Sequence, residues 1–255
     1  MSTTKLQIVS DVHLEFLKKS SFPNITPHAA NLALLGDIGK PFLDTYKDFL
    51  EVQSKAFKNV FVLMGNHEYY NSSKTVEVIL AKARDVCSLF PNVHLLERDT
   101  YDITDNTRIL GCTLWSMINA YSAKCMNDFE KIKIKNNTAK MALDRPTYVS
   151  WHIRDVAWLN SEISKAKTEG KKVVVLTHHG ALLEMSGQYV GSAISSAFVS
   201  DLRHLFCDPV IAFASGHVHS NVDVYLNNIR SVSNALGYPG EKGTEYKENI
   251  TIDFP

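Results

Sequence analysis

Five short clusters that contain Asp, Asn or His recur along this chain of 255 residues, and each follows a run of apolar residues. The clusters are Asp11-Val12-His13, Gly36-Asp37, Gly65-Asn66-His67-Glu68, Thr177-His178-His179 and Gly216-His217-Val218-His219. Carboxylate and amide oxygens combined with neutral imidazole nitrogens form a mixed donor set that suits divalent transition metals. An Asp able to bridge, joined by Asn and several His residues, is typical of two ions held about 3.5–4 Å apart. The residue types therefore predict a site for two metal ions.

The spacing of these residues supports the same interpretation. Asp11 and His13 are two residues apart, as are His217 and His219, so in extended backbone both side chains of each pair point the same way. A lone Asp-x-His or Gly-Asp is usually structural, and Gly-Asn-His-Glu and Gly-His-x-His are moderately specific. All five clusters in order, each after an apolar run, indicate a functional site.

The apolar runs predict the strands that position the clusters. Strands are expected at 6–10, 31–35, 59–64, 108–112, 172–176, 210–215, 222–226, 229–233 and 250–254. Asn227 and Asn228 lie between two of these strands and predict a hairpin turn. Because ligands of an open α/β sheet bind beyond the carboxyl ends of its strands, we expect the five clusters to meet in one crevice.

Amphipathic stretches between the strands predict helices at 42–57, 73–89 and 147–167. Ser72 or Ser73 is expected to cap the second helix, and Gly170 to end the third. This alternation predicts α/β architecture, with parallel strands early in the chain and hairpin strands late. We expect a single domain over 1–255, with a cap-like insertion at about 116–146 and a long surface loop at 183–197.

The composition narrows the function classes. Lys plus Arg and Asp plus Glu are 27 each, and this formal net charge of zero gives no support to a broad nucleic-acid or membrane-surface footprint. No stretch approaches the roughly 18 apolar residues of a membrane span, and the first ten residues do not resemble a signal peptide. The four cysteines include no Cys-x-x-Cys pair, which argues against a zinc ribbon. We therefore expect a cytoplasmic protein without a membrane or nucleic-acid partner.

The series Asp11-x-His13, Gly36-Asp37, Gly65-Asn66-His67-Glu68, His178 and Gly216-His217-x-His219 resembles the calcineurin-like metallophosphoesterase superfamily. The motifs span residues 11–219, which is most of the chain. The resemblance implies a four-layer α/β/β/α sandwich of two mixed sheets flanked by helices. It also implies that Asp37 bridges two ions, one held by Asp11, His13 and His219 and the other by Asn66, His178 and His217.

The same resemblance implies how such a site works. Two ions lower the pKa of a shared water, and the resulting bridging hydroxide attacks phosphorus in line. His67 would face the substrate, as catalytic acid or as a donor to the transition-state oxygens. Residues that would support the ligands or contact the substrate are His179, Glu68 and Tyr70, although His179 could equally be a loop residue, Glu68 a structural residue and Tyr70 a core residue. The histidines expected to be structural or superficial are His28, His94, His152 and His204.

Departures from family patterns narrow the choice of branch. Ser/Thr protein phosphatases of this superfamily carry Gly-Asp-x-Val-Asp-Arg-Gly, where this chain has Gly36-Asp37-Ile38-Gly39-Lys40-Pro41. Lys40 replaces the Asp that orients the catalytic His, and Pro41 replaces the phosphate-binding Arg, so a protein phosphatase is disfavoured. The Gly-His-x-His motif instead resembles the phosphodiesterase-type branch, and the tail over 234–241 resembles small members of that group.

The expected function is hydrolysis of a small phosphodiester, nucleotide or phosphomonoester. Neutral net charge argues against a nuclease, which usually needs a basic groove. A scaffold protein of the same fold with little activity is the alternative from another class, and the presence of every ligand and of His67 argues against it. The expected cofactors are two divalent ions, for which manganese, iron, zinc and cobalt all suit the mixed ligands.

Overall fold

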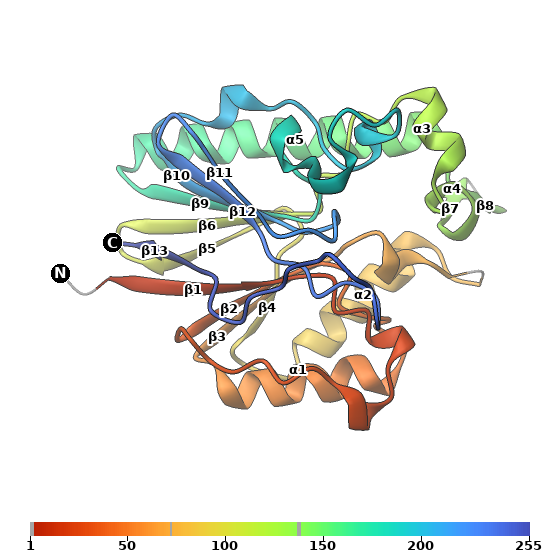
Figure 1. The fold of residues 1–255 in the computed structure, drawn as a ribbon, viewed down its shortest axis with the longest axis horizontal. Helices are drawn as coiled ribbons and strands as arrows, with labels where there is room; N and C mark the ends of the chain where they lie inside the picture. The colour runs from red at the N-terminus through yellow and green to blue at the C-terminus, as the bar shows by residue number, and fades with distance from the viewer. Residues whose placement is uncertain (1–2, 72, 137–138) are drawn as a thin grey trace.

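The central strands are buried along nearly their whole length, because both faces of each sheet are covered. Every residue of β2 (Asn31–Leu35) and of β6 (Thr107–Cys112) is buried. The structure, a computed structural model, describes residues 3–71, 73–136 and 139–255. Two large sheets pack face to face between outer helices, which confirms the predicted four-layer α/β/β/α sandwich (Figure 1).

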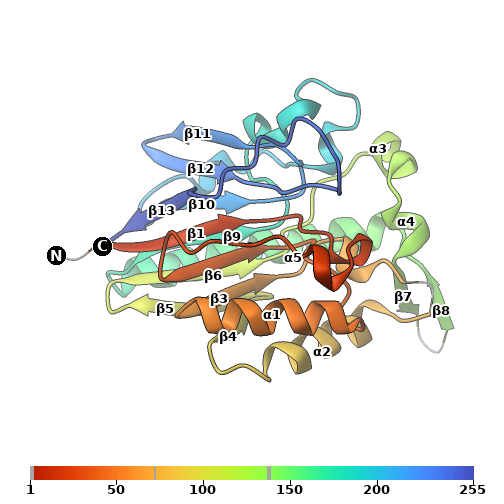
Figure 2. The ribbon, with the colours of Figure 1, turned by 60° about the horizontal axis from the view of Figure 1, so that its bottom comes forward.

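The first sheet has the order β13-β1-β2-β3-β4. Strands β1 (Thr4–Val9), β2, β3 (Asn59–Leu63) and β4 (Val93–Leu95) run parallel, and β13 (Thr251–Phe254) pairs antiparallel with β1. Helices α1 (Asp44–Ala56) and α2 (Val76–Cys87) cover the outer face of this sheet (Figures 1 and 2). The parallel order brings the ends of β1, β2 and β3, and the three clusters that follow them, to one edge.

The second sheet has the order β11-β12-β10-β9-β6-β5. Strands β6, β9 (Lys172–Thr177), β10 (Val210–Ser215) and β12 (Ile229–Ser233) run parallel. The edge strands β5 (Asp99–Thr104) and β11 (Val222–Leu226) are antiparallel to their neighbours, and α5 (Arg145–Thr168) covers the outer face. The two clusters after β9 and β10 thus arrive beside those of the first sheet.

The two sheets are joined by an apolar layer of small and branched side chains. Leu6, Ile8 and Leu63 of the first sheet belong to one buried cluster with Val174 and Ala212 of the second. A fully buried Val, Leu or Ile contributes about 1.5–3 kcal/mol to the free energy of unfolding. This layer fixes the position of the two sheets, and of the clusters that follow their strands, relative to each other.

Several element boundaries differ from the predicted ones for local reasons. Helix α2 begins after Thr75, so Ser73 is not its cap, and Ser72 lies outside the described residues. Helix α5 begins after Asp144, whose side chain accepts a hydrogen bond from the Thr147 N–H at 2.8 Å. Pro146 is tolerated in this first turn because its missing N–H would have no partner there. The predicted turn at Asn227 and Asn228 is confirmed, with φ of 53° and 62°.

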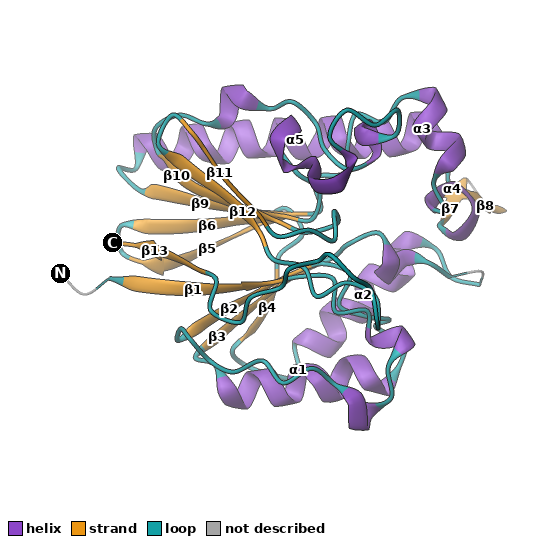
Figure 3. Ribbon diagram, in the orientation of Figure 1, coloured by secondary structure: helices purple, strands orange, loops and turns teal. Residues whose placement is uncertain are grey.

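Residues 116–146 contain more regular structure than their weak periodicity predicted. They form the short helices α3 (Ala120–Cys125) and α4 (Asp128–Lys131) and the two-stranded sheet of β7 (Lys133–Asn136) and β8 (Ala139–Ala142). This segment lies at the end of the molecule toward which the parallel strands run (Figures 1 and 2). Figure 3 shows long loops gathered at the same end. Within the described residues, no helix is long and apolar enough to cross a bilayer.

Candidate metal centre

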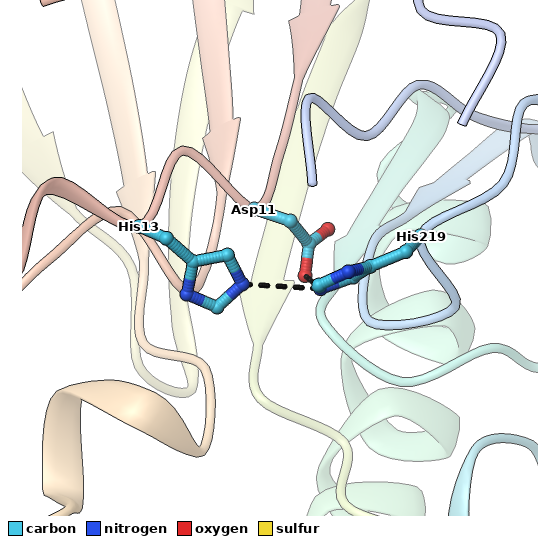
Figure 4. Close-up of side chains that lie close together, drawn as sticks. All are labelled: Asp11, His13 and His219. Carbon is cyan, nitrogen blue, oxygen red and sulfur yellow. Dashed lines mark hydrogen bonds and ion pairs between the residues drawn. The ribbon is translucent and has the colours of Figure 1, made fainter. Parts of the chain in front are cut away.

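The five clusters meet at the carboxyl ends of β1, β2, β3, β9 and β10, where the two sheets face each other. Asp11, His13 and His219 form one group in which a potential ligand atom of each residue lies within 4.8 Å of the others (Figure 4). A second group of the same kind contains Asp37, His178 and His217, all of them buried. The structure therefore brings together side chains from both sheets that the sequence predicted as ligands.

The loops that carry these side chains are strained and tightly connected. Left-handed φ angles of 47° to 70° occur at five of the predicted ligands: Asp11, His13, Asp37, His217 and His219. Each such residue without glycine's freedom costs about 1–2 kcal/mol. The strain is offset by hydrogen bonds between loops, such as Asp11 N–H to Gly36 O at 3.1 Å and His13 N–H to Asp37 O at 2.9 Å. Strain of this kind clusters where function demands a fixed geometry.

Gly36 and Gly65 allow the loops to approach this closely. Gly36 has a φ of +85°, and a Cβ there would lie 2.5 Å from His178 Nδ1. A Cβ on Gly65 would lie 2.2 Å from Asp37 Oδ1 and 2.7 Å from His178 Cε1. Neither position accepts a side chain without displacing a predicted ligand.

In the first group, two imidazoles face each other through the same nitrogen. His13 Nε2 lies 3.0 Å from His219 Nε2, and His219 Nε2 lies 3.4 Å from Asp11 Oδ1 (Figure 4). The Nδ1 atoms face carboxylates, that of His13 at 3.3 Å from Glu15 Oε1 and that of His219 at 2.7 Å from Glu241 Oε2. These partners favour a proton on Nδ1 of both rings, which directs the Nε2 atoms of both rings at the same point. A cation at that point, either a proton shared between the two nitrogens or a metal ion bound by both, satisfies them.

The electrostatics of the first group also favour a positive charge. Burial lowers the pKa of His219, but the neighbouring carboxylates of Asp11 and Glu241 outweigh burial and raise this pKa to about 9. Burial by itself would raise the pKa of Asp11, yet His219 and the other histidines hold this pKa well below the usual range. The field at this point attracts a cation, and a divalent ion fits it.

The second group is buried and contains a nitrogen without a partner. His178 Nδ1 lies 2.8 Å from Leu35 O, which places the proton there and leaves Nε2 free, 3.6 Å from Asp37 Oδ1 and 3.1 Å from Asn66 Oδ1. His217 Nε2 is buried and has no hydrogen-bond partner. An unpaired buried acceptor is costly, so this donor set also fits a metal ion.

The amide of Asn66 is oriented by a residue of the inserted segment. Asn66 Nδ2 donates to Asp128 Oδ1 at 2.9 Å and to the Tyr70 hydroxyl at 2.9 Å. Tyr70 in turn donates to the same Asp128 oxygen at 3.0 Å. Because Asp128 and Tyr70 hold the NH₂ group, the amide oxygen Oδ1 of Asn66 faces His178. Asp128 is fully buried, and burial raises its pKa to about 6 despite these two donors.

His67 stands beside the two groups with both ring nitrogens occupied. Its Nδ1 lies 3.0 Å from Glu15 Oε1, and its Nε2 lies 3.1 Å from the Tyr238 hydroxyl. Its backbone N–H donates to Asp37 Oδ1 at 2.7 Å. Burial lowers the pKa of His67 to about 4, against the opposing effect of Glu15. Lys40, which replaces the orienting Asp of the protein phosphatases, instead donates to the His67 carbonyl.

The three residues expected near the ligands have different surroundings. Glu68 is buried and accepts hydrogen bonds from the backbone N–H groups of Asp37, Ile38 and Gly65 at 2.7–3.0 Å, so it holds the loop that carries Asp37 in place. His179 Nε2 faces the Tyr148 hydroxyl at 3.2 Å, and His179 belongs to neither ligand group. Tyr70 contacts Asp128 and lines a cavity that opens beside the two ligand groups.

Four residues at the site were not predicted from the sequence. They are Glu15, Asp128, Tyr238 and Glu241, and three of them, all but Tyr238, lie within hydrogen-bond distance of a predicted ligand. Glu15 could have been noticed, because it continues the alternation of Asp11 and His13 by two more residues. Glu241 lies in the segment 234–241, whose only signal is a resemblance to other proteins, and nothing in the sequence links Glu241 to His219. Asp128 carries no local signal.

Comparison with known proteins agrees with this geometry. Residues 5–221 match the family model for the calcineurin-like phosphoesterases. The uncharacterized protein L509 of Acanthamoeba polyphaga mimivirus is 31% identical over 264 residues, covering 93% of this chain and 92% of that protein.

Solved structures share the fold at low identity. The phosphopantetheinyl hydrolase of Mycobacterium tuberculosis is 16% identical, with a TM-score of 0.69 over 92% of this chain and 90% of the other. A dimetal phosphatase from Danio rerio is 13% identical, with a TM-score of 0.54 over 90% of this chain and 86% of the other. From the family match and the two ligand groups together, we conclude that the chain belongs to the calcineurin-like phosphoesterase family and is a metal-dependent phosphoesterase.

Proposed function

We propose that this chain hydrolyses a small phosphoester with the help of two divalent metal ions. The observation that supports this most directly is the set of imidazole nitrogens that lack a partner or face one another: Nε2 of His13, His217 and His219. Among the described residues, His217 Nε2 is buried without any hydrogen-bond partner, and Nε2 of His13 and of His219 have each other as partner. Cations are the partners that suit them.

We assign Asp11, His13 and His219 to one ion, and Asn66, His178 and His217 to the other. Asp37 would bridge the two. In support, the Asp37 carboxylate is buried, and burial together with Glu68 and Asp11 raises its pKa well above the usual range. A carboxylate in such a place needs a nearby cation to remain charged at neutral pH.

When bound, two divalent ions would supply a nucleophile from water at neutral pH and neutralise charge on the phosphoryl oxygens. The chain's own residues would transfer a proton and position the substrate. His67 lines the cavity, and its Nε2 would carry a proton to the leaving oxygen, while Glu15 holds the proton on Nδ1. The Tyr238 hydroxyl is hydrogen-bonded to the same Nε2, and a substrate oxygen would take the place of this hydroxyl.

The substrate we propose is a small phosphodiester, nucleotide or phosphomonoester, and the phosphodiesterase-type branch fits it best. The arginine that binds phosphate in protein phosphatases is replaced by Pro41, and the net charge of zero does not favour a nucleic-acid substrate. The inserted segment 116–146 contributes Cys125, Met126 and Asn127 to the cavity, which supports its role as a cap on a single domain.

The test is hydrolysis of bis(p-nitrophenyl) phosphate by the full chain, stripped of metal by a chelator and reloaded with Mn²⁺, Fe²⁺, Zn²⁺ or Co²⁺. We expect turnover that disappears with the chelator and returns with two equivalents of one of these ions. A folded protein, verified by circular dichroism, that turns over neither this diester nor p-nitrophenyl phosphate with any of the four ions would contradict the proposal. It would then support a scaffold role.

A further inference from the structure

A cavity of about 260 Å³ opens directly above the candidate metal centre. Its floor is made by Asp37, Asn66, His67, His217 and His219. Its walls come from three separate segments, namely residues 125–127 of the insertion, residues 189–198 and residues 238–241. The floor belongs to the site already described, whereas the walls decide what fits beside a bound phosphoryl group.

One wall is a stack of aromatic rings. The ring of Tyr189 lies on that of Phe198 with centroids 3.8 Å apart and planes at 7°, and Phe198 lies 4.9 Å from the ring of His217. Ile194 extends this wall. The stack therefore runs from the metal centre outward, with Tyr189 at its outer end.

A second part of the cavity lining, at Tyr238, is also aromatic. Tyr238 stacks on His13 at 4.3 Å and meets His219 edge-on at 4.7 Å. Phe16, which is largely exposed, meets Tyr238 edge-on at 5.6 Å and continues the apolar surface outside the cavity. Aromatic rings thus line the cavity at Tyr189 and at Tyr238, and such rings suit a flat, uncharged group.

The walls offer almost no charge to a ligand. Among the described residues that line the cavity there is no Lys or Arg. The one wall carboxylate, Glu241, is already engaged by His219 and by the Tyr238 N–H at 2.8 Å. Lys40 and Lys131 lie near, but their ammonium groups sit over the Tyr70 ring, 5.1 and 5.3 Å from its centroid, and do not line the cavity.

Resting on the proposed function, we infer that the substrate is a phosphodiester whose ester groups are uncharged and that one of them is a flat ring held between Tyr189 and Tyr238. A phosphomonoester carries nearly two negative charges at pH 7, and its additional charge is usually met by Arg or Lys, which this cavity lacks. A diester carries one charge. Aromatic and apolar walls favour an uncharged ring over any second phosphate or carboxylate.

The reaction is a hydrolysis that balances without a further reactant. The oxygen of water forms a bond to phosphorus, and the bond from phosphorus to one ester oxygen breaks with its electron pair on that oxygen. One proton of water reaches the leaving oxygen through His67, which gives an alcohol or phenol. The other proton is released, and the second ester group remains on a phosphomonoester product.

The decisive comparison uses two diesters with the same leaving group, phenyl p-nitrophenyl phosphate and methyl p-nitrophenyl phosphate, on the Mn²⁺-loaded protein. We expect a kcat/KM at least about 10-fold higher for the phenyl ester, roughly the effect of one good aromatic contact. Tyr189→Ala should bring the ratio close to one and Tyr189→Phe should keep it. The control Tyr121→Ala, an exposed tyrosine outside the cavity, should leave the ratio unchanged.

A charge test and a binding test complete the design. Ile194→Arg or Met126→Lys adds a cation to the wall and should raise turnover of p-nitrophenyl phosphate relative to the diesters. In the His67→Ala protein, calorimetry should show phenylphosphonate binding at least about 10-fold more tightly than methylphosphonate. Equal turnover of both diesters together with equal binding of both phosphonates would overturn this inference while leaving the proposed function intact. Absence of all turnover would instead refute the proposed function.

Discussion

Glu15 Oε1 lies 3.0 Å from Nδ1 of His67, although Glu15 belongs to none of the predicted motifs. The same oxygen lies 3.3 Å from Nδ1 of His13, so one carboxylate faces both a proposed metal ligand and the proposed catalytic histidine. In this chain Lys40 stands where protein phosphatases carry the orienting Asp. Glu15 thus provides from the first loop the support that Lys40 cannot provide.

Glu15→Gln should impair both histidines without unfolding the protein. We expect kcat to fall about 10–100-fold, the usual cost of losing a residue that orients a ligand. Nitrogen-15 NMR of the His67 ring should show loss of the single tautomer with the proton on Nδ1. Glu51→Gln, on the exposed side of α1, is the matched control. An unchanged tautomer and unchanged kcat would remove Glu15 from this role.

His67→Ala should separate chemistry from metal binding. We expect both metal ions to remain, since His67 belongs to neither proposed ligand set, while kcat falls about 10²–10⁴-fold, the range for acid–base groups. Metal analysis of the gel-filtered protein and steady-state kinetics on bis(p-nitrophenyl) phosphate would check both parts. Loss of a metal equivalent would show that His67 is a ligand instead.

Asp37→Ala should remove both ions or leave them loosely held, because Asp37 is the proposed bridge. Gly65→Ala should have a similar effect from the other side, since its Cβ would lie 2.2 Å from Asp37 Oδ1. Metal content by mass spectrometry of the elements is the measurement. If Asp37→Ala retains two ions per chain and full activity, the bridging assignment is wrong.

Asp128→Ala should weaken the binding of the ion that we assign to Asn66, His178 and His217, even though Asp128 lies in the inserted segment. Without Asp128, the Asn66 amide loses the partner that turns its oxygen toward His178. We expect the affinity for the second Mn²⁺ equivalent to fall about 10–100-fold by calorimetry. Glu130→Ala, an exposed change on the same helix, should leave this affinity as it is. Equal loss in both variants would point to general damage to α4.

Asp155 should make stability depend on pH. It is buried against Arg98 at 2.6 Å, and burial, with Glu97, raises its pKa to about 7. The folded state therefore binds this proton more tightly than the unfolded state, whose Asp pKa is about 3.9. Stability should fall as pH rises from about 4 to 7, by up to about 1.4 kcal/mol per pH unit.

Urea unfolding of the metal-free protein at pH 5, 6 and 8 would measure this effect. Asp155→Asn should flatten the dependence and keep an acceptor for Arg98. Asp105→Asn, an exposed change, serves as the control. A wild-type and an Asp155→Asn protein with parallel curves would show that Asp155 does not titrate in this range.

The arrangement of the ligand clusters could be predicted because each follows a strand directly. Once β1, β2 and β3 are parallel, Asp11, Asp37 and Asn66 must emerge at one edge, and no tertiary detail is needed to see it. The hairpin at Asn227 was predictable for the same reason, since its signal lies within the turn itself. Local sequence determines these features.

The residues that orient the ligands could not be predicted, because their partners are distant in the chain. Asp128 is 62 residues from Asn66, and Glu15 is 52 residues from His67. Only the packing of the inserted segment and the first loop brings them together. Strand β5 was missed because it is a half-exposed edge strand whose sequence, Asp-Thr-Tyr-Asp-Ile-Thr, carries two aspartates.

The pairing of β1 with β13 makes completion of the first sheet depend on two segments that are distant in the chain, since Thr4 pairs with Phe254. His13 likewise meets His219 only across a separation of 206 residues. Contacts between such distant segments require the closure of long loops, which costs conformational entropy and slows folding. The two ligand groups therefore form only when the two sheets come together, and the unfolded chain presents its histidines to a metal ion one at a time.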